Sequence, residues 1–166
     1  MPSYFGKYRG KVKNNIDPLM LGRVQVSVSA VLGDTSLTWA MPSVPYAGNG
    51  VGFFMIPPVG ANVWVEFEGG DLQSAIWSGC FWGQGETPAS PAIPQMKVIK
   101  VDGITLTLSE LPGAGGVTLE VSPPVVAVPL KMTFDSTGIK IEATGLGSVQ
   151  VTPAGVTLDD GALEVN

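Results

Sequence analysis

Few side chains of this sequence could take part in catalysis, and their types limit the chemistry. The sequence contains no histidine and a single cysteine, Cys80. This excludes a histidine base, histidine metal ligands, disulfides, zinc knuckles and CxxC redox pairs. Two carboxylates, Glu66 and Glu68, stand on one face of an expected strand, roughly 7 Å apart by strand rise. Such a pair could serve a glycosidase, but nothing around it indicates a substrate cleft, so we expect no enzyme.

Two further charged groups invite a functional interpretation. Three acidic residues lie near the C-terminus: Asp159, Asp160 and Glu164. In a threefold assembly they would converge and could hold a hard cation, although a solvated acidic tip is the simpler interpretation. Four basic residues alternate along an expected N-terminal strand: Lys7, Arg9, Lys11 and Lys13. They could bind along a nucleic-acid backbone. They could equally form a solvated face or a docking face for an acidic partner. Because the net charge is −5 and the pI about 4.5, phosphate binding is disfavoured. We expect no catalytic, metal or cofactor site.

The composition predicts a folded protein of short elements. Glycine and proline contribute 22 and 14 of 166 residues, and hydrophobic residues 45 %. Charged residues make up only 14 %, against about 25 % in an average protein. No window reaches the ~20 apolar residues of a membrane helix, and the N-terminus does not resemble a secretory signal. We therefore expect a soluble protein made in a reducing compartment, without a signal peptide or transmembrane segment.

The two halves differ in composition. All four tryptophans and all three tyrosines precede residue 86, and the whole net charge of −5 comes from the residues after Gly85. A proline-rich stretch, GQGETPASPAIP, lies between the halves and indicates a semi-extended linker. The sequence therefore predicts one domain over 1–84, a linker over 85–96 and a second domain over 97–166.

The first region predicts five strands. They alternate with period 2 and have turn residues between them: FGKYRGKVK, RVQVSVSAV, TWAMPSVPYA, NVWVEFE and SAIWSGCFWG. The prolines of the third run suit an edge or bulged strand. Cys80, within an apolar strand, is expected to be buried. Five short strands with glycine at the bends match a small barrel, and the OB-fold is the leading candidate.

The second region predicts short strands, each with one apolar face. The residues expected to point inward are aliphatic: Ile104, Leu106, Leu108, Val117, Leu119, Val121, Ile139, Ile141, Val149, Val151, Val156, Leu158, Leu163 and Val165. A single copy would expose this face and its strand edges, which is an aggregation hazard. Three copies around one axis would bury it, so we expect an intertwined, triple-stranded trimeric β-helix. The alternative is a small sandwich domain within one chain.

The first region also resembles a known family. The order DPLMLGRVQVSV, then WAMPSVPYAGNGVGFFMIPPVGANVWVEFEGGD, then IWSGCFWG is similar to the OB-fold domain of contractile-tail spike proteins, over roughly residues 5–83. That family includes phage baseplate assembly protein V, the gp5-type spike and the VgrG proteins of type VI secretion and extracellular injection systems. The most specific residues are those of the turns: Asp17, Pro18, Gly22, Arg23, Pro57, Pro58, Gly60, Gly70 and Asp71.

The resemblance implies a structural role and a set of partners. It implies a homotrimeric spike that is made in the bacterial cytoplasm and lies in the baseplate of a virion or phage-like particle. The spike would puncture the target envelope. VgrG proteins carry a hub before the OB domain and this chain begins almost at that domain, so a separate hub protein is implied, with the basic face as its docking surface. The histidine-containing metal tip of several phage spikes is absent. The residues Asp159, Asp160 and Glu164 would instead contact a PAAR-like tip protein, and the tail tube would be an indirect neighbour.

A second function is kept open. The first region could be an OB-type module that binds single-stranded nucleic acid or glycan, with the second region as an oligomerising stalk. That alternative predicts salt-sensitive oligonucleotide binding, whereas a spike predicts none.

Overall fold

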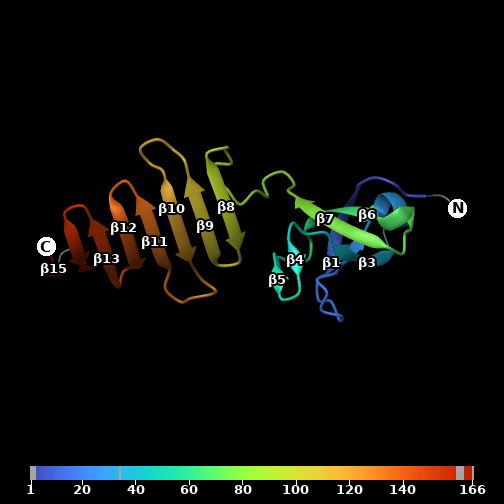
Figure 1. The fold of residues 1–166 in the computed structure, drawn as a ribbon, viewed down its shortest axis with the longest axis horizontal. Coiled ribbons are helices and arrows are strands. Elements are labelled where there is room, and N and C mark those ends of the chain that lie inside the picture. The colour runs from blue at the N-terminus through green and yellow to red at the C-terminus, as the bar shows by residue number, and fades with distance from the viewer. Residues whose placement is uncertain (1–2, 34, 160–162, 166) are drawn as a thin grey trace. The chain divides into compact units, whose positions relative to one another are not determined.

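A computed structural model describes residues 3–33, 35–159 and 163–165. Contacts divide the chain into two units, Met1–Glu86 and Thr87–Asn166. The expected all-β fold is confirmed. The strands, shown in Figure 1, are β1 Tyr8–Asn14, β2 Val24–Ser27, β3 Leu37–Pro42, β4 Ala47–Gly48, β5 Val51–Gly52, β6 Asn62–Phe67, β7 Ala75–Phe81, β8 Met96–Val101, β9 Ile104–Ser109, β10 Gly116–Val121, β11 Leu130–Asp135, β12 Gly138–Ala143, β13 Gly147–Thr152, β14 Gly155–Leu158 and β15 Leu163–Val165.

The N-terminal unit is a closed five-stranded barrel in the order β1-β2-β3-β7-β6, as an OB-fold requires. All pairs are antiparallel except β3 with β7, which is parallel. The strands alternate buried and accessible residues, so period-2 patterning fills the interior. The core consists of small and medium apolar side chains with two aromatics: Val12, Val24, Val26, Val28, Ala40, Val63, Val65, Phe67, Ala75 and Trp77.

Four local expectations for this unit are wrong. The second run does not continue as a strand, because α1 (Ser29–Leu32) follows β2 after one residue. The third run is not an edge, since β3 pairs on both sides. Glu68 does not share the strand face of Glu66: β6 ends at Phe67, and Glu68 begins the short 3-10 turn η1 (Glu68–Gly70). Cys80 is exposed, because it lies near the end of β7, beyond a register shift in the pairing of β6 with β7.

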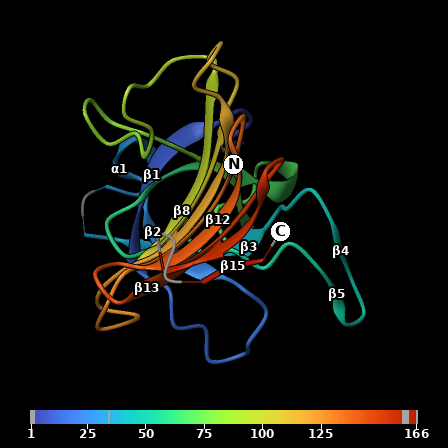
Figure 2. The same cartoon turned by 90° about the vertical axis from the view of Figure 1, so that its left-hand side faces the viewer.

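The C-terminal unit contains one antiparallel sheet of eight strands in the order β15-β14-β13-β12-β11-β10-β9-β8. Every strand therefore pairs with its neighbours in sequence, and successive hairpins run along the sheet (Figure 1). Figure 2 shows these strands one behind another in a twisted stack. Only β8 and β15 leave an unpaired edge among the described strands of this sheet.

Candidate functional site

Apolar side chains gather on one of the two faces of the C-terminal sheet, and we refer to that face as the apolar face. Alternate residues of a strand point to opposite sides, and residues directly opposite on paired strands point to the same side. The register opposes Leu119 to Leu106 and to Met132, Met132 to Ile141, and Ile141 to Val149. One continuous row of aliphatic side chains therefore crosses five strands.

The register brings the predicted inward residues together on this face. It opposes Leu108 to Val117, Ile104 to Val121, Ile139 to Val151, Val149 to Leu158 and Val151 to Val156. Leu163 and Val165 pair through the backbone with Leu158 and Val156, but their side chains lie outside the described residues.

Sequence reasoning missed several members of the apolar face. They are Ile99, Val101, Leu130, Met132, Phe134 and Ala143, which the register opposes to members already named. The signal was present in the run LKMTFD, where Leu130, Met132 and Phe134 alternate with Lys131, Thr133 and Asp135. Phe134 shows that this face accepts an aromatic side chain.

The apolar face has nothing to cover it within one chain. None of the described residues from 87 to 159 is buried, whereas every buried apolar residue belongs to the barrel. The exposed fraction is 48 % for Ile141, 43 % for Val151 and 40 % for Leu108, all within strands. A contiguous apolar surface of this extent marks an interaction site on a folded protein.

The opposite face of the sheet is polar along most of its length. The register opposes Thr118 to Thr107 and to Thr133, and Glu120 to Lys131. On β12 the Lys140 ammonium lies 2.8 Å from the Glu142 carboxylate. A sheet with one apolar and one hydrated face is built to pack on one side only.

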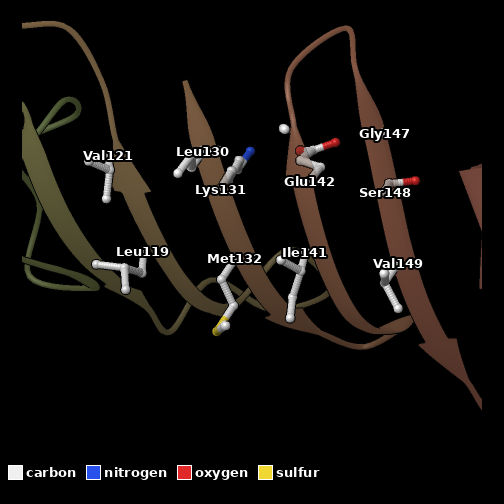
Figure 3. Close-up of a pocket in the computed structure, with 11 residues that line it drawn as sticks. Leu119, Val121, Leu130, Lys131, Met132, Ile141, Glu142, Gly147, Ser148 and Val149 are labelled. Atoms are coloured by element: carbon white, nitrogen blue, oxygen red, sulfur yellow. The ribbon is translucent and has the colours of Figure 1, made fainter. Parts of the chain in front are cut away.

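A hollow of about 400 Å³ lies on the apolar face. Figure 3 shows Leu119, Met132, Ile141 and Val149 side by side along it, from four successive strands. Ala143 and Gly147, which are opposed across β12 and β13, also line it. The hollow arises because these two residues carry little or no side chain where their neighbours carry large ones.

The predicted basic face lies on β1 and on the residue before it, but its charges are partly committed. The Lys7 ammonium pairs with the Glu66 carboxylate and donates to the Ser78 hydroxyl at 2.8 Å. This lowers the pKa of Glu66, mainly through the hydrogen bond from Lys7. The Arg9 guanidinium lies 5.8 Å from the ring centre of Trp64, a cation–π distance.

All four basic residues of this face are exposed, Lys11 and Lys13 among them. Glu66, which pairs with Lys7, thus serves as a partner for a lysine rather than as half of a carboxylate dyad.

The loop between β1 and β2 is organised around Asp17. Its carboxylate accepts from the backbone N–H groups of Leu19 (3.0 Å) and Leu21 (2.8 Å) and from the Arg23 guanidinium (2.7 Å to Nη2). The Arg23 hydrogen bond holds the pKa of Asp17 well below its usual range, and the side chain of Asp17 is only 4 % exposed. The residues of the family motif in this loop therefore close a turn.

Gly22 is the glycine that this loop requires. Its φ is +76°, and a Cβ there would lie 3.2 Å from the Cδ1 atom of Ile56. Its carbonyl accepts from the buried Trp77 indole at 3.3 Å. The loop is thus anchored to the barrel core.

The other motif residues also form turns. The Ala61 N–H donates to the Pro58 carbonyl at 3.0 Å before β6, where the Asn15 amide donates to the Pro57 carbonyl at 3.2 Å. The remaining motif residues lie in these or similar turns: Pro18, Gly60, Gly70 and Asp71. We conclude that the residues of the family motif form the connections between the strands of the barrel.

Replacing Asp17 by asparagine is expected to lower the melting temperature of the barrel by several degrees at pH 7. Because the folded-state pKa is depressed, the carboxylate stabilises the fold above the ordinary aspartate pKa of 3.8, and this is lost as the pH falls below it. The difference in melting temperature between Asp17→Asn and the native chain should therefore become smaller as the pH is lowered from 5 to 2. Tryptophan fluorescence follows this barrel selectively, since all four tryptophans lie in the first unit.

Glu68→Gln, at an exposed position, provides the control and should leave the melting temperature unchanged at either pH. If the difference in melting temperature between Asp17→Asn and the native chain stays constant down to pH 2, the role given to Asp17 is contradicted.

The acidic residues predicted at the tip are only partly described. Asp159 is exposed, and its carboxylate accepts from the Ser148 N–H at 3.2 Å. Asp160 lies outside the described residues, and of Glu164 only the backbone pairing with Thr157 is described. Within the described part of the chain, no three Cys, Asp or Glu side chains are grouped to hold a metal ion. Nor does that part contain a helix long and apolar enough to cross a membrane.

Comparison with known proteins gives two matches, one for each unit. Residues 8–82 match the type VI secretion system/phage-baseplate injector OB domain. Residues 97–164 match the phage baseplate V C-terminal trimerisation domain. No curated protein matches the chain. The second match assigns the unit with the uncovered apolar face to a domain that trimerises.

Proposed function

Because the chain belongs to the phage baseplate V family of baseplate spike proteins, we propose that it is the central spike of a contractile injection machine. In this proposal three copies form the spike, the barrels anchor it in a separate hub protein, and the C-terminal sheets form a rigid needle that punctures the target envelope. A PAAR-like protein covers the tip, and the tail tube is an indirect neighbour. The role is structural rather than enzymatic.

The apolar face carries this proposal. A sheet that is polar on one side and aliphatic on the other buries its apolar side when three such sheets, one from each chain, enclose a common axis. Mid-strand residues such as Ile141, 48 % exposed in one chain, would then form the dry interior. The aliphatic residues predicted to point inward are the ones we assign to it.

Rigidity is the property that puncturing demands. In the sheet each internal strand has both neighbours, so its backbone groups are paired on both sides. A closed trimer adds side-chain packing across the axis, and the lifetime of such an assembly depends on its unfolding rate more than on its equilibrium stability. A needle of this kind transmits force without bending.

Two observations disfavour the nucleic-acid alternative and an enzyme. Lys7 and Arg9, half of the basic face, are engaged with Glu66 and with the Trp64 ring. The carboxylates Glu66 and Glu68 lie in a strand and in the following turn, not on one strand face. The basic face is better suited to dock on an acidic hub.

The proposal predicts the mass of the native chain in solution. Light scattering should give three times the 17.2 kDa of one chain, and a large fraction of the trimer should survive denaturing detergent without boiling. Oligonucleotide binding should be undetectable at low salt, where a phosphate-binding surface is strongest. A monomer of 17.2 kDa would overturn the proposal.

A further inference from the structure

The apolar face differs at its two margins, where the strands end. One margin, which we call the hollow margin, includes Val121, Leu130, Ala143 and Gly147, and it borders the hollow of about 400 Å³. At the other, which we call the aromatic margin, Phe134 is opposed to Val117 and to Ile139. Phe134 is 41 % exposed, and it is the only aromatic residue after residue 82.

Phe134 cannot reach the end of the hollow formed by Ala143 and Gly147 in its own chain. It is opposed to Ile139 on β12, and Ala143 lies four residues further along that strand. Four residues of extended strand span about 13 Å. Most of the width of the sheet therefore separates Phe134 from the end of the hollow that lies over Ala143 and Gly147.

Threefold symmetry brings these two features together. We consider three identical sheets, one from each copy, that enclose an axis with their apolar faces inward. The contact between neighbouring copies is then heterologous, so each corner joins one margin of a sheet to the opposite margin of the next. Every corner of the trimer then places an aromatic margin against a hollow margin. The apolar face that the trimerisation domain must cover is continuous with both.

We propose that Phe134 of each copy inserts into the hollow of the next copy, over Ala143 and Gly147. This inference rests on the proposed trimer and specifies how its corners close. The hollow is lined on this face by Leu119, Met132 and Ile141, so an aromatic ring would meet aliphatic atoms there. Aromatic rings that fill apolar pockets dominate the energetics of interfaces.

A cysteine pair across the corner tests the contact in the full chain. Because native Cys80 is exposed, the test starts from Cys80→Ser and adds Phe134→Cys with Ala143→Cys. Positions about 13 Å apart in one chain cannot form an internal disulfide. Oxidation should therefore convert most chains into covalent trimers of three times 17.2 kDa on non-reducing denaturing gels.

The controls separate the possible contacts. Phe134→Cys alone and Ala143→Cys alone should remain monomeric on the gel, as should Phe134→Cys paired with Thr118→Cys, which places the second thiol on the polar face. Covalent dimers from Phe134→Cys alone would place this residue at the axis and overturn the proposal. The absence of cross-linked species from the Phe134/Ala143 pair would overturn it as well.

A volume exchange provides a second test. Phe134→Ala and Ala143→Phe should each lower the temperature at which the trimer dissociates in detergent, and the double variant should recover most of the loss. Residues this far apart in one chain should contribute additively, so additive losses would overturn the proposal. If the native chain is a monomer, the proposed function itself fails; a native trimer without cross-linking or coupling rejects the corner contact alone.

Discussion

Lysine in place of Ile141 is expected to leave the protein unable to form trimers. Ile141 lies in the middle of the row that crosses the apolar face, opposed to Met132 and Val149. In the trimer, three ammonium groups would be buried around one axis, and among the described residues the register opposes only apolar side chains to this position. Burying one unpaired ion costs several kcal/mol, and like charges near one another add to this. The trimeric form should therefore disappear.

Light scattering measures this outcome directly. The Ile141→Lys chain should give 17.2 kDa or heterogeneous aggregates in place of three times that mass. Thr118→Lys is the matched control, because Thr118 lies mid-strand on the opposite, polar face. It should remain trimeric. A heat-resistant trimer of Ile141→Lys would show that the apolar face does not line the interior.

Alanine in place of Gly138 should have the second largest effect, a marked loss of heat resistance. Gly138 begins β12 with a φ of +140°, and a Cβ there would overlap the Val151 carbonyl oxygen on β13. The strained backbone and the steric overlap each cost about 1–3 kcal/mol. Three copies carry the change, so the assembled trimer is affected three times over.

Gly145→Ala separates the two causes. Gly145 also has a positive φ, +74°, but no atom lies within 4 Å of the position that a Cβ would take. The Gly145→Ala variant should carry only the cost of backbone strain and no steric overlap. The temperature of dissociation in detergent should therefore be highest for the native chain, lower for Gly145→Ala and lowest for Gly138→Ala. Equal losses for the two variants would contradict the close approach of β12 to β13.

Most strands could be predicted because their residues alternate. The confirmed barrel follows from runs such as NVWVEF, where Val63, Val65 and Phe67 are buried and the residues between them are not. The second region repeats the pattern in most of its strands, so its apolar face followed from the same rule. The strand β8 departs from it, because Lys97 is opposed to Leu108 and Val98 to Thr107. The resemblance to the spike family, carried by turn residues such as Asp17, is confirmed by the family matches.

Other features depend on contacts that alternation does not reveal. Phe134 alternates with the polar residues of its strand, but only its register opposite Val117 and Ile139 places it on the apolar face. The exposure of Cys80 depends on a register shift between β6 and β7, which no local pattern in β7 specifies. The hollow at Ala143 and Gly147 requires knowing which residues are opposed across two strands.

The sequential order of the C-terminal strands makes the length of this sheet a modular quantity. Each strand adds about 4.8 Å along the sheet, so eight strands span roughly 34 Å, and one further hairpin would add about 10 Å. Because hairpins pair only with their sequence neighbours, duplication or deletion of one hairpin leaves the pairing of the others intact. Duplication or deletion of hairpins can therefore change the length of the sheet in steps of two strands without altering the width of the remaining strands.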